Sequence, residues 1–397
     1  MNRKGYKTRL SNIAFVLQGQ SPESIYYSDS EGTPFLQGNR TFGNLFPTFD
    51  TYTKRVTKMA IKGDVLMSVR APVGDLNFAP CDLCIGRGLV SLRAKDGNNK
   101  FVYYALKYNV GNLLKQGSAT TFDSVNKDII NDFELIIPED KSKWNKVEAI
   151  LSSLDSKIEL NNRINNELAE MAKTFYDYWF VQFDFPNKNG KPYKTSGGKM
   201  IWNEELKREI PEEWQNGELK DIANITMGQS PPGESYNDDG DGMIFFQGCT
   251  DFGNRFPSIR QFTTAPTRYA KEGDVLLSVR APVGTLNIAK EDCCIGRGLA
   301  ALNSKDNCIS FLFGVMINLK QIFDRRNVDG TTFGSITKDD LFSLKVVRPA
   351  KEILKKYHAI INPTFQLQNK IELENLELAE LRDWLLPMLM NGQVKVN

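Results

Sequence analysis

The stretch GDVLMSVRAPVGDLN at residues 63–77 returns as GDVLLSVRAPVGTLN at residues 273–287, with one methionine replaced by leucine and one aspartate replaced by threonine. A second shared stretch, CIGRGL, stands at residues 84–89 and again at 294–299. The shorter matches GQSP and FGN precede these stretches in both halves of the chain. Solenoid repeats recur roughly every 20–50 residues, a far shorter period than this one. The sequence therefore indicates one domain that has been duplicated.

Each copy combines strand signals with helix signals. Residues 64–69 form a short apolar run that follows a glycine and ends at a Pro-Val-Gly turn, which is typical of a strand. Residues 88–93 and 133–137 are also predicted to be strands. Residues 100–114 place apolar side chains at helical spacing. We therefore predict an α+β fold with two repeated mixed α/β domains.

A different pattern follows each copy, in which apolar residues recur at alternating steps of three and four over about 35 residues. This spacing is typical of a helix in a coiled coil. The predicted seam residues are Leu151, Leu154, Ile158, Leu168 and Phe175 in the first helix, and Ile371, Leu378, Leu381 and Leu385 in the second. Asn161 and Asn165 interrupt the first seam; polar seam residues weaken such a helix but fix its register. Pro363 is expected to kink the second helix or to start its long part.

A polar segment rich in Gly, Pro and Lys separates the first helix from the second copy, and is predicted to be a connector. Each helix would thus follow its own domain directly. The expected organisation is a first domain at 1–140, a central helix at 141–182, the connector at 183–217, a second domain at 218–350 and a C-terminal helix at 351–397.

The composition, 41% hydrophobic and 25% charged, is that of an ordinary globular protein. No apolar run approaches the roughly 18 residues of a membrane helix, and no secretory signal is visible, so a cytoplasmic protein is expected. The net charge of only +2 argues against coating nucleic acid by bulk charge, so any basic face must be local. The six cysteines include one CxxC but no second ligand pair, so we expect buried thiols rather than a metal site.

The sequence contains no motif that indicates catalysis, so we predict no catalytic residues. The single histidine, His358, has no counterpart in the first half, and no GxxxxGK[ST] loop for ATP is present. NPTF at 362–365 resembles the NPPF-type loop of amino-methyltransferases. The sequence has no glycine-rich motif for the cofactor of such enzymes, so this tetrapeptide is better explained as the entry to a helix. PEDKSK at 138–143 is interpreted as a surface turn, and NDDGDG at 237–242, which lacks the later glutamate of a calcium loop, as an acidic turn.

Two related domains, each followed by a long helix, resemble the specificity subunit of a type I restriction–modification system. The resemblance covers nearly the whole chain and depends on SVRAPVG and CIGRGL in both copies and on LRDWLLPMLMNGQV at residues 381–394. It implies two target-recognition domains that read a split double-stranded DNA target, and two helices packed as an antiparallel coiled coil with pseudo-twofold symmetry. A helix of about 35 residues is roughly 50 Å long, enough to separate the domains by more than one turn of DNA.

The resemblance also implies partners and cofactors. Two methyltransferase subunits would bind the chain and supply S-adenosylmethionine for adenine methylation, and restriction or translocase subunits that use ATP and Mg could join them. The chain itself would need no cofactor. Two other readings stay open: a scaffold that only holds protein partners, and a self-contained enzyme, which the missing motifs disfavour.

The residues shared by both copies are candidates for DNA contacts, because arginine and lysine bind phosphates and arginine can bind guanine with two hydrogen bonds. The alternative for the arginines is that they only pin loops to their own domain. Residues that differ between the copies are expected to carry differences in the sequence read. The shared candidates are Gln20, Ser21, Arg70, Arg87, Thr121, Lys127, Gln229, Ser230, Arg280, Arg297, Thr332 and Lys338. The variable candidates are Asn39, Arg40 and Leu45, which face Cys249, Thr250 and Arg255, with Gly38 and Gly248 as backbone pivots.

Overall fold

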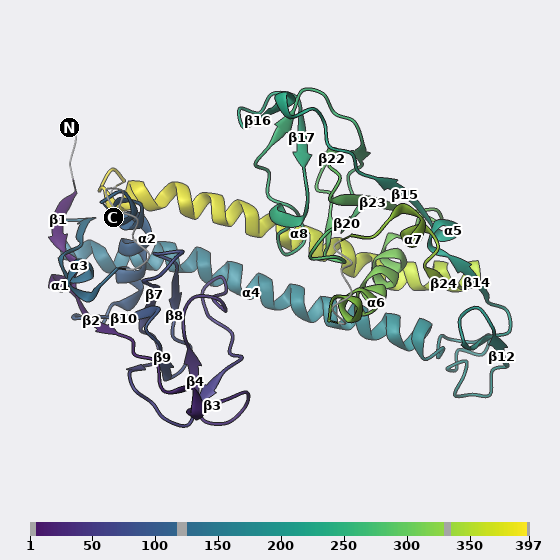
Figure 1. Cartoon of the computed structure of the whole chain (residues 1–397), viewed down its shortest axis with the longest axis horizontal. Helices are drawn as coiled ribbons and strands as arrows, with labels where there is room; N and C mark the ends of the chain where they lie inside the picture. The colour runs from purple at the N-terminus through teal and green to yellow at the C-terminus, as the bar shows by residue number, and fades with distance from the viewer. Residues whose placement is uncertain (1–4, 117–124, 329–334, 395–397) are drawn as a thin grey trace. The chain divides into compact units, whose positions relative to one another are not determined.

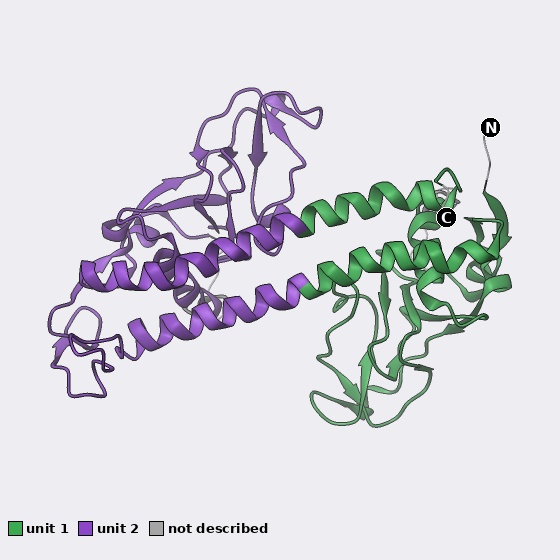
Figure 2. Cartoon of the chain, turned by 180° about the vertical axis from the view of Figure 1, so that it is seen from behind, with its two compact units in different colours: residues 1–160, 375–397 green, residues 161–374 purple. Residues whose placement is uncertain are grey.

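The computed structural model of the protein describes residues 5–116, 125–328 and 335–394 (Figure 1). The chain divides into two compact units, which Figure 2 colours separately. Unit 1 comprises residues 1–160 and 375–397, and unit 2 comprises residues 161–374. Both units mix strands with helices, as the sequence predicts. Among the helices of the described residues, none combines the length and the apolar character that a membrane crossing requires.

Unit 1 contains two main sheets and a short strand pair. The four-stranded sheet has the order β2-β10-β7-β8, formed by Ala14–Gln18, Leu89–Ala94, Val65–Ser68 and Leu76–Phe78. The five-stranded sheet has the order β3-β5-β4-β9-β6, formed by Tyr27–Ser28, Tyr52–Thr53, Thr33–Leu36, Leu83–Ile85 and Met59–Ala60. Strand β1, Tyr6–Arg9, pairs with β11, Glu134–Ile137. The helices are α1 at Leu10–Ile13, α2 at Asn99–Gln116 and α3 at Lys127–Asp132, with single turns η1 at Ser24–Tyr26 and η2 at Lys141–Lys143.

Unit 2 repeats this arrangement. Its four-stranded sheet has the order β15-β23-β20-β21, formed by Ala223–Met227, Leu299–Ser304, Val275–Ser278 and Leu286–Ile288. Its five-stranded sheet has the order β16-β18-β17-β22-β19, formed by Tyr236–Asn237, Phe262–Thr263, Met243–Phe246, Cys293–Ile295 and Tyr269–Ala270. Strand β14, Gln215–Glu218, pairs with β24, Lys345–Arg348. The helices are α5 at Leu219–Ile222, α6 at Ile309–Val328 and α7 at Lys338–Phe342, with single turns η4 at Gly233–Ser235 and η5 at Cys249–Asp251.

The duplicated GDVL stretch is the centre of each four-stranded sheet. Every residue of β7 and of β20 is buried, which is why these strands read as continuous apolar runs. Asp64 is 1% exposed and is held by Ser91 and by both Nε and Nη2 of Arg93 on the neighbouring strand β10. A buried carboxylate needs such partners, because an unpaired buried charge is costly. The predicted strands in the first copy and the helix predicted at 100–114 are confirmed.

The two long helices are α4, Trp144–Tyr176, which continues into the π-helical turn Asp177–Val181 (η3), and α8, Lys351–Met390. Each contributes residues to both units. In unit 1, Nη1 of Arg382 lies 2.7 Å from Oδ1 of Asp155, and Leu151, one turn earlier on α4, shares a core with Leu389, further along α8. The two helices therefore run antiparallel within this unit.

The two helices also run antiparallel in unit 2. The side-chain amide of Gln368 donates to the carbonyl of Asn165 at 3.1 Å, and the rings of Trp179 and Tyr357 lie 5.7 Å apart. As the residue number rises on α4, it falls on α8. The knobs-into-holes packing of a coiled coil and the pseudo-twofold symmetry stay predictions.

The buried stripe of α8 differs from the predicted seam. Leu381 is 42% exposed, whereas its neighbour Arg382 is 8% exposed. The reason is that the stripe contains polar residues that apolar spacing cannot reveal: Gln368, Glu372, Asn375 and Arg382 are all buried. Of the other predicted seam residues, Leu151, Ile158 and Ile371 are buried, and Leu154, Leu168, Phe175, Leu378 and Leu385 are partly buried. Pro363 and NPTF lie inside α8, so neither marks the start of the helix.

The segment predicted as a connector is more ordered than its composition suggests. It contains an antiparallel hairpin of β12, Met200–Asn203, and β13, Arg208–Pro211. Phe183, Phe185 and Trp214 belong to the main core of unit 2, with the ring centroids of Phe185 and Trp214 4.7 Å apart. A few aromatic residues in a polar segment thus suffice to anchor it, because each one buries a large apolar surface.

Candidate nucleic-acid interface

Two parallel strands place the predicted loop residues of unit 1 side by side. Strands β4 and β9 pair in parallel, so the residues that follow both strands leave the sheet at the same edge. There the N–H of Gly86 donates to the carbonyl of Leu36 at 2.8 Å, and that of Gly88 donates to the carbonyl of Gln37 at 3.1 Å. Arg87 stands between the two glycines on this edge.

Further main-chain hydrogen bonds attach three more segments to this edge. The N–H of Gln20 donates to the carbonyl of Ile85, and the N–H of Val69 donates to that of Gly88, both at 2.9 Å. Val69 in turn accepts from the N–H of Val125 at 2.9 Å. Five segments that are distant in sequence therefore meet. We call them rim 1: residues 19–21, 37–39, 69–74, 86–88 and 125–127.

Unit 2 contains the same arrangement. Strands β17 and β22 pair in parallel, and Gly298 donates to the carbonyl of Gln247 at 3.1 Å. The N–H of Val279 donates to the carbonyl of Gly298 at 2.9 Å, and the N–H of Ile336 donates to that of Val279 at 2.8 Å. Gln229 donates to the carbonyl of Ile295 at 3.0 Å. These segments form rim 2: residues 228–230, 247–249, 279–284, 296–298 and 336–338.

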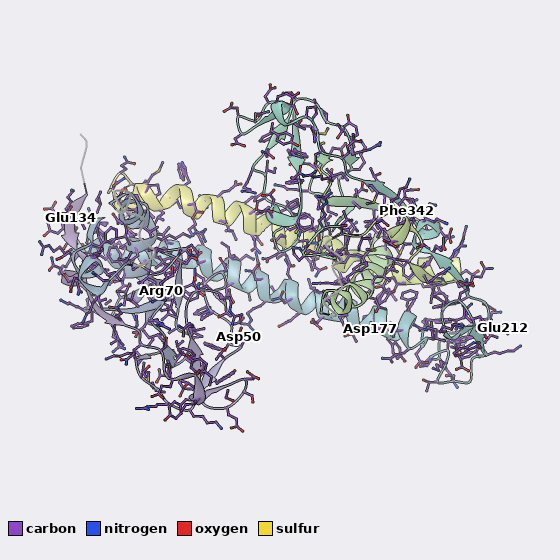
Figure 3. The ribbon with its side chains drawn as sticks, viewed as in Figure 1. Asp50, Arg70, Glu134, Asp177, Glu212 and Phe342 are labelled. Atoms are coloured by element: carbon purple, nitrogen blue, oxygen red, sulfur yellow. The ribbon has the colours of Figure 1, made fainter. Side chains whose placement is uncertain are left out.

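Four arginines project from the two rims. Arg70, which Figure 3 labels, and Arg87 are exposed in rim 1, as are Arg280 and Arg297 in rim 2. None of the four guanidinium groups has a hydrogen bond or ion pair with another described residue. Main-chain hydrogen bonds hold these loops in place, and the four arginine side chains do not take part. This favours an external ligand over the alternative that the arginines pin their own loops.

The two predicted lysines occupy equivalent places at the ends of the rims. Lys127 is the first residue of α3 and Lys338 the first residue of α7, and both side chains are exposed. Lys338 Nζ lies 5.3 Å from the centroid of the Phe342 ring. Thr121 and Thr332, the two threonines among the shared candidates for DNA contacts, lie outside the described residues.

The rims also contain a pair that sequence reasoning missed. Oγ of Ser21 donates to Oε1 of Gln37 at 2.9 Å, and in unit 2 the Oγ of Ser230 lies 3.1 Å from Oε1 of Gln247. The signal was visible in the repeat, because a Gln-Gly pair follows an apolar run at residues 37–38 and again at 247–248. The predicted residues Gln20 and Gln229 are exposed and adjoin these serines.

The variable stretch differs between the units through its ion pairs. In unit 1, Nη2 of Arg40 lies 2.6 Å from Oδ2 of Asp50, whose pKa is lowered by hydrogen bonds from Thr51 and Arg40. In unit 2, Arg260 stands at the position equivalent to Asp50 and pairs with Asp251. The charge order along the chain is thus reversed.

Other side chains of this stretch also differ. Asn39 donates to Oδ2 of Asp75 at 2.6 Å and faces the carbonyl of Pro72. Its counterpart Cys249 is followed by the exposed Thr250, and Asp75 is replaced by Thr285. Leu45 is buried in the core of unit 1. Because its side-chain amide is bound to Asp75, Asn39 already takes part in an intramolecular contact.

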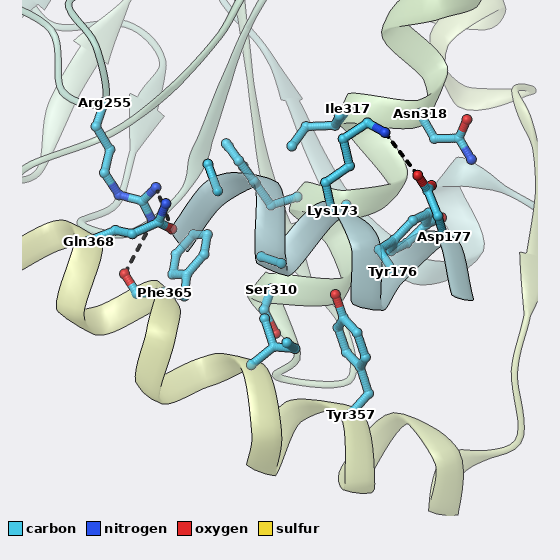
Figure 4. Close-up of a pocket in the computed structure, with 15 residues that line it drawn as sticks. Lys173, Tyr176, Asp177, Arg255, Ser310, Ile317, Asn318, Tyr357, Phe365 and Gln368 are labelled. Atoms are coloured by element: carbon cyan, nitrogen blue, oxygen red, sulfur yellow. Dashed lines mark hydrogen bonds and ion pairs between the residues drawn. The ribbon is translucent and has the colours of Figure 1, made fainter. Parts of the chain in front are cut away.

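Arg255 does not behave as the sequence predicted for a DNA-reading residue. Its guanidinium donates to Asn369, to Oε1 of Gln368 and to the carbonyl of Phe365, all on α8, and it lies 4.2 Å from the centroid of the Phe365 ring. Burial lowers its pKa to about 10. Figure 4 shows it at one side of a cavity of about 70 Å³ that residues of α4, α6 and α8 also line, Tyr357 among them. Arg255 therefore holds its loop against α8.

Among the described residues, no group of three or more His, Cys, Asp or Glu side chains is placed to hold a metal ion. All six cysteines are unpaired, and Cys84, Cys293, Cys294 and Cys308 are buried. Burial and the neighbouring Cys294 raise the pKa of Cys293 to about 12. The four buried thiols are therefore members of the core.

Comparison with known families finds one domain twice in this chain. The family model of the type I restriction modification DNA specificity domain matches residues 6–170 and again residues 211–382. The chain belongs to this family. It is thus a specificity subunit of a type I restriction–modification system, the component that recognises the DNA target and that has no catalytic activity of its own.

Relatives of this specificity subunit span most of its length. It is 31% identical over 324 residues to a Methanocaldococcus jannaschii protein assigned as the specificity subunit of the type I restriction enzyme MjaX, covering 78% of this chain and 72% of the relative. It is 24% identical to the MjaIX specificity subunit of the same organism, covering 84% of this chain and 78% of the relative. The crystal structure of a type I S subunit from M. genitalium has the same fold, with a TM-score of 0.58 at 16% identity, covering 99% of this chain and 96% of that one.

Proposed function

We propose that this specificity subunit reads a split DNA target, with rim 1 on one half and rim 2 on the other. The observation that carries the proposal is the recurrence of one hydrogen-bonded rim, with two exposed and unpaired arginines, in both units. Exposed guanidinium groups on a main-chain framework suit DNA, because they can bind phosphates or the O6 and N7 atoms of guanine. The net charge of +2 is compatible with such local contacts.

We further propose that the long helices bind two methyltransferase subunits, and that restriction subunits join the same complex. Apolar side chains that remain exposed on the helices support this. On α8, Leu381 and Trp384 in unit 1 are 42% and 58% exposed, and Ile360 and Leu367 in unit 2 are 46% and 44% exposed. Exposed apolar groups that gather along one element are typical of protein interfaces. S-adenosylmethionine, ATP and Mg would belong to these partners.

The test is to co-express the chain with its methyltransferase subunit and to map methylated adenines across the genome of the host. We expect an interrupted motif whose two halves are in inverted orientation, because each domain is followed by a helix and the two helices are antiparallel. The halves should share some bases, because the two rims are built alike. Direct repeats or one uninterrupted motif would refute the proposed architecture. DNA binding that fails even with the methyltransferase present would favour a scaffold instead.

Variants of single rim residues link the motif to the structure. Arg87→Ala should weaken recognition in one half of the target, and Arg297→Ala should weaken it in the other. The matched control is Arg9→Ala, because Arg9 lies on β1 outside the rim and only pairs with Asp132 on the surface. Full and fully specific binding by both rim variants would contradict the assignment of the rims to DNA.

A further inference from the structure

The side-chain amide of Gln37 is held in one orientation at the edge of rim 1. The N–H of Arg87 lies 3.3 Å from Oγ of Ser21, which therefore accepts that hydrogen, and its own hydroxyl proton goes to Oε1 of Gln37 at 2.9 Å. Gln37 is nevertheless exposed, and its Nε2 has no hydrogen-bond partner among the described residues. The amide thus turns its acceptor toward the protein and keeps its N–H donors available.

The glycines of the duplicated CIGRGL stretch are required by this glutamine. A Cβ on Gly86 would lie 2.9 Å from Cα of Gln37 and 3.0 Å from Oγ of Ser21, and a Cβ on Gly88 would lie 2.6 Å from the carbonyl oxygen of Gln37. Contacts below 3.0 Å are not tolerated by real side chains. The CIGRGL stretch, which is identical in both copies, therefore needs its two glycines to make room for the glutamine, and Arg87 between them stays exposed.

Unit 2 repeats the seat of the glutamine, with one difference in how the serine meets its amide. The N–H of Arg297 lies 3.3 Å from Oγ of Ser230. This hydroxyl lies 3.1 Å from Oε1 of Gln247 and 2.9 Å from its Nε2, so it contacts both atoms of the amide. A Cβ on Gly296 would lie 2.9 Å from Cα of Gln247, and a Cβ on Gly298 would lie 2.7 Å from its carbonyl oxygen. The same three residue types, Ser, Gln and Arg, thus lie together in both units, although neighbouring residues differ between them.

We propose that Gln37 and Gln247 are specificity-determining residues, each of which reads a guanine in its half of the target together with Arg87 or Arg297. This rests on the proposed function. In rim 1 the Gln37 amide and the Arg87 guanidinium present only donors to the outside. In rim 2 the Ser230 hydroxyl can donate to Oε1 of Gln247, which gives that amide the same orientation. In the major groove guanine presents two acceptors, O6 and N7. The competing explanation is that the amide only stabilises its turn.

The substitution Gln37→Glu separates these explanations. A carboxylate still accepts the hydroxyl hydrogen bond from Ser21, so the turn is retained, but the donors are replaced by a charged acceptor that O6 and N7 of guanine repel. The full chain is co-expressed with its methyltransferase subunit, and the complex selects duplexes from a randomised library. We expect one guanine to be lost from one half of the selected motif, with affinity for the original target lower by about 10- to 100-fold.

Two further variants complete the experiment. Gln247→Glu should have the same effect on the other half alone. Gln215→Glu, at an exposed glutamine on β14 outside rim 2, is the matched control and should leave both halves unchanged. The melting temperature of each variant should equal that of the parent chain.

The outcomes distinguish this inference from the function on which it rests. A parent complex that selects no defined motif refutes the proposed function. A parent complex with a clear motif that Gln37→Glu and Gln247→Glu leave intact overturns the inference alone. Equal weakening for every sequence, or loss of preference at a base other than guanine, also overturns it, because the first outcome is that of a structural turn and the second that of a different base.

Discussion

Replacing Arg382 in unit 1 should lower the free energy of unfolding far more than replacing a cationic residue on the surface. The Asp155 carboxylate is 2% exposed and is held by Nη1 of Arg382 at 2.7 Å and by the hydroxyl of Tyr104 at 2.6 Å. Burial and the Asp155 carboxylate raise the pKa of Tyr104, so this hydroxyl stays a neutral donor. In Arg382→Met the carboxylate keeps one hydrogen bond but loses its countercharge. Breaking a buried pair in this way costs about 3–5 kcal/mol in free energy of unfolding.

The double variant Asp155→Asn with Arg382→Met should recover most of this loss. Asn still accepts from Tyr104 and is uncharged, so the remaining cost should fall to about 1–2 kcal/mol. Lys7→Met is the surface control: its partner Glu134 is 55% exposed, and the change should cost less than about 1 kcal/mol. Urea unfolding, together with hydrogen exchange in residues 375–390, measures all three. A loss below about 1 kcal/mol in Arg382→Met alone would refute the reasoning.

Four other outcomes are expected. The isolated chain should neither methylate nor cleave DNA nor hydrolyse ATP, and methyl transfer by the chain alone would contradict its assignment. Arg87→Ala or Arg297→Ala should cost about 1–3 kcal/mol of DNA binding for a base contact, measured on targets altered one base pair at a time; a phosphate contact should weaken all sequences alike. Leu381→Asp should leave the free energy of unfolding almost unchanged but impair assembly with the methyltransferase subunit. Leu389→Asp should unfold unit 1, because Leu389 is only 2% exposed, and circular dichroism would show the loss of structure. The pKa of the Cys293 thiol is raised from about 9 in the unfolded chain to about 12 in the native state. Its contribution to stability is therefore fully present below about pH 9 and is lost as the pH rises to about 12, which urea titrations at several pH values would detect.

The duplication made much of this structure predictable from the sequence. Residues kept in both copies, such as Arg87 and Arg297, proved to occupy equivalent places in two rims, because the same strands and glycines recur around them. The buried strands were recognisable because their apolar runs are short and are bounded by Gly and Pro.

The parts that were missed share a physical cause. Apolar spacing finds helix faces that are buried among apolar residues, and it fails where the buried face is polar, as at Gln368 and Arg382. Arg255 was assigned to DNA from its position in a variable loop, yet its partners lie more than a hundred residues later on α8, which local sequence cannot reveal. Gln37 was overlooked because its partners Ser21 and Arg87 are also distant in the chain, although the repeat offered a clue.

The composition of unit 1 has a consequence for the order in which the protein is made. This unit begins with the first residues of the chain but includes residues 375–397, and Leu386, Leu389 and Met390 are part of its core. At a synthesis rate of roughly 5–20 residues per second, the ribosome needs about 10–40 s to pass from the first part of the unit to the second. During that interval the apolar surface around Leu151 lacks its covering segment. Unit 2, residues 161–374, is complete before unit 1, so the portion of the chain that is synthesised first is the last to be finished.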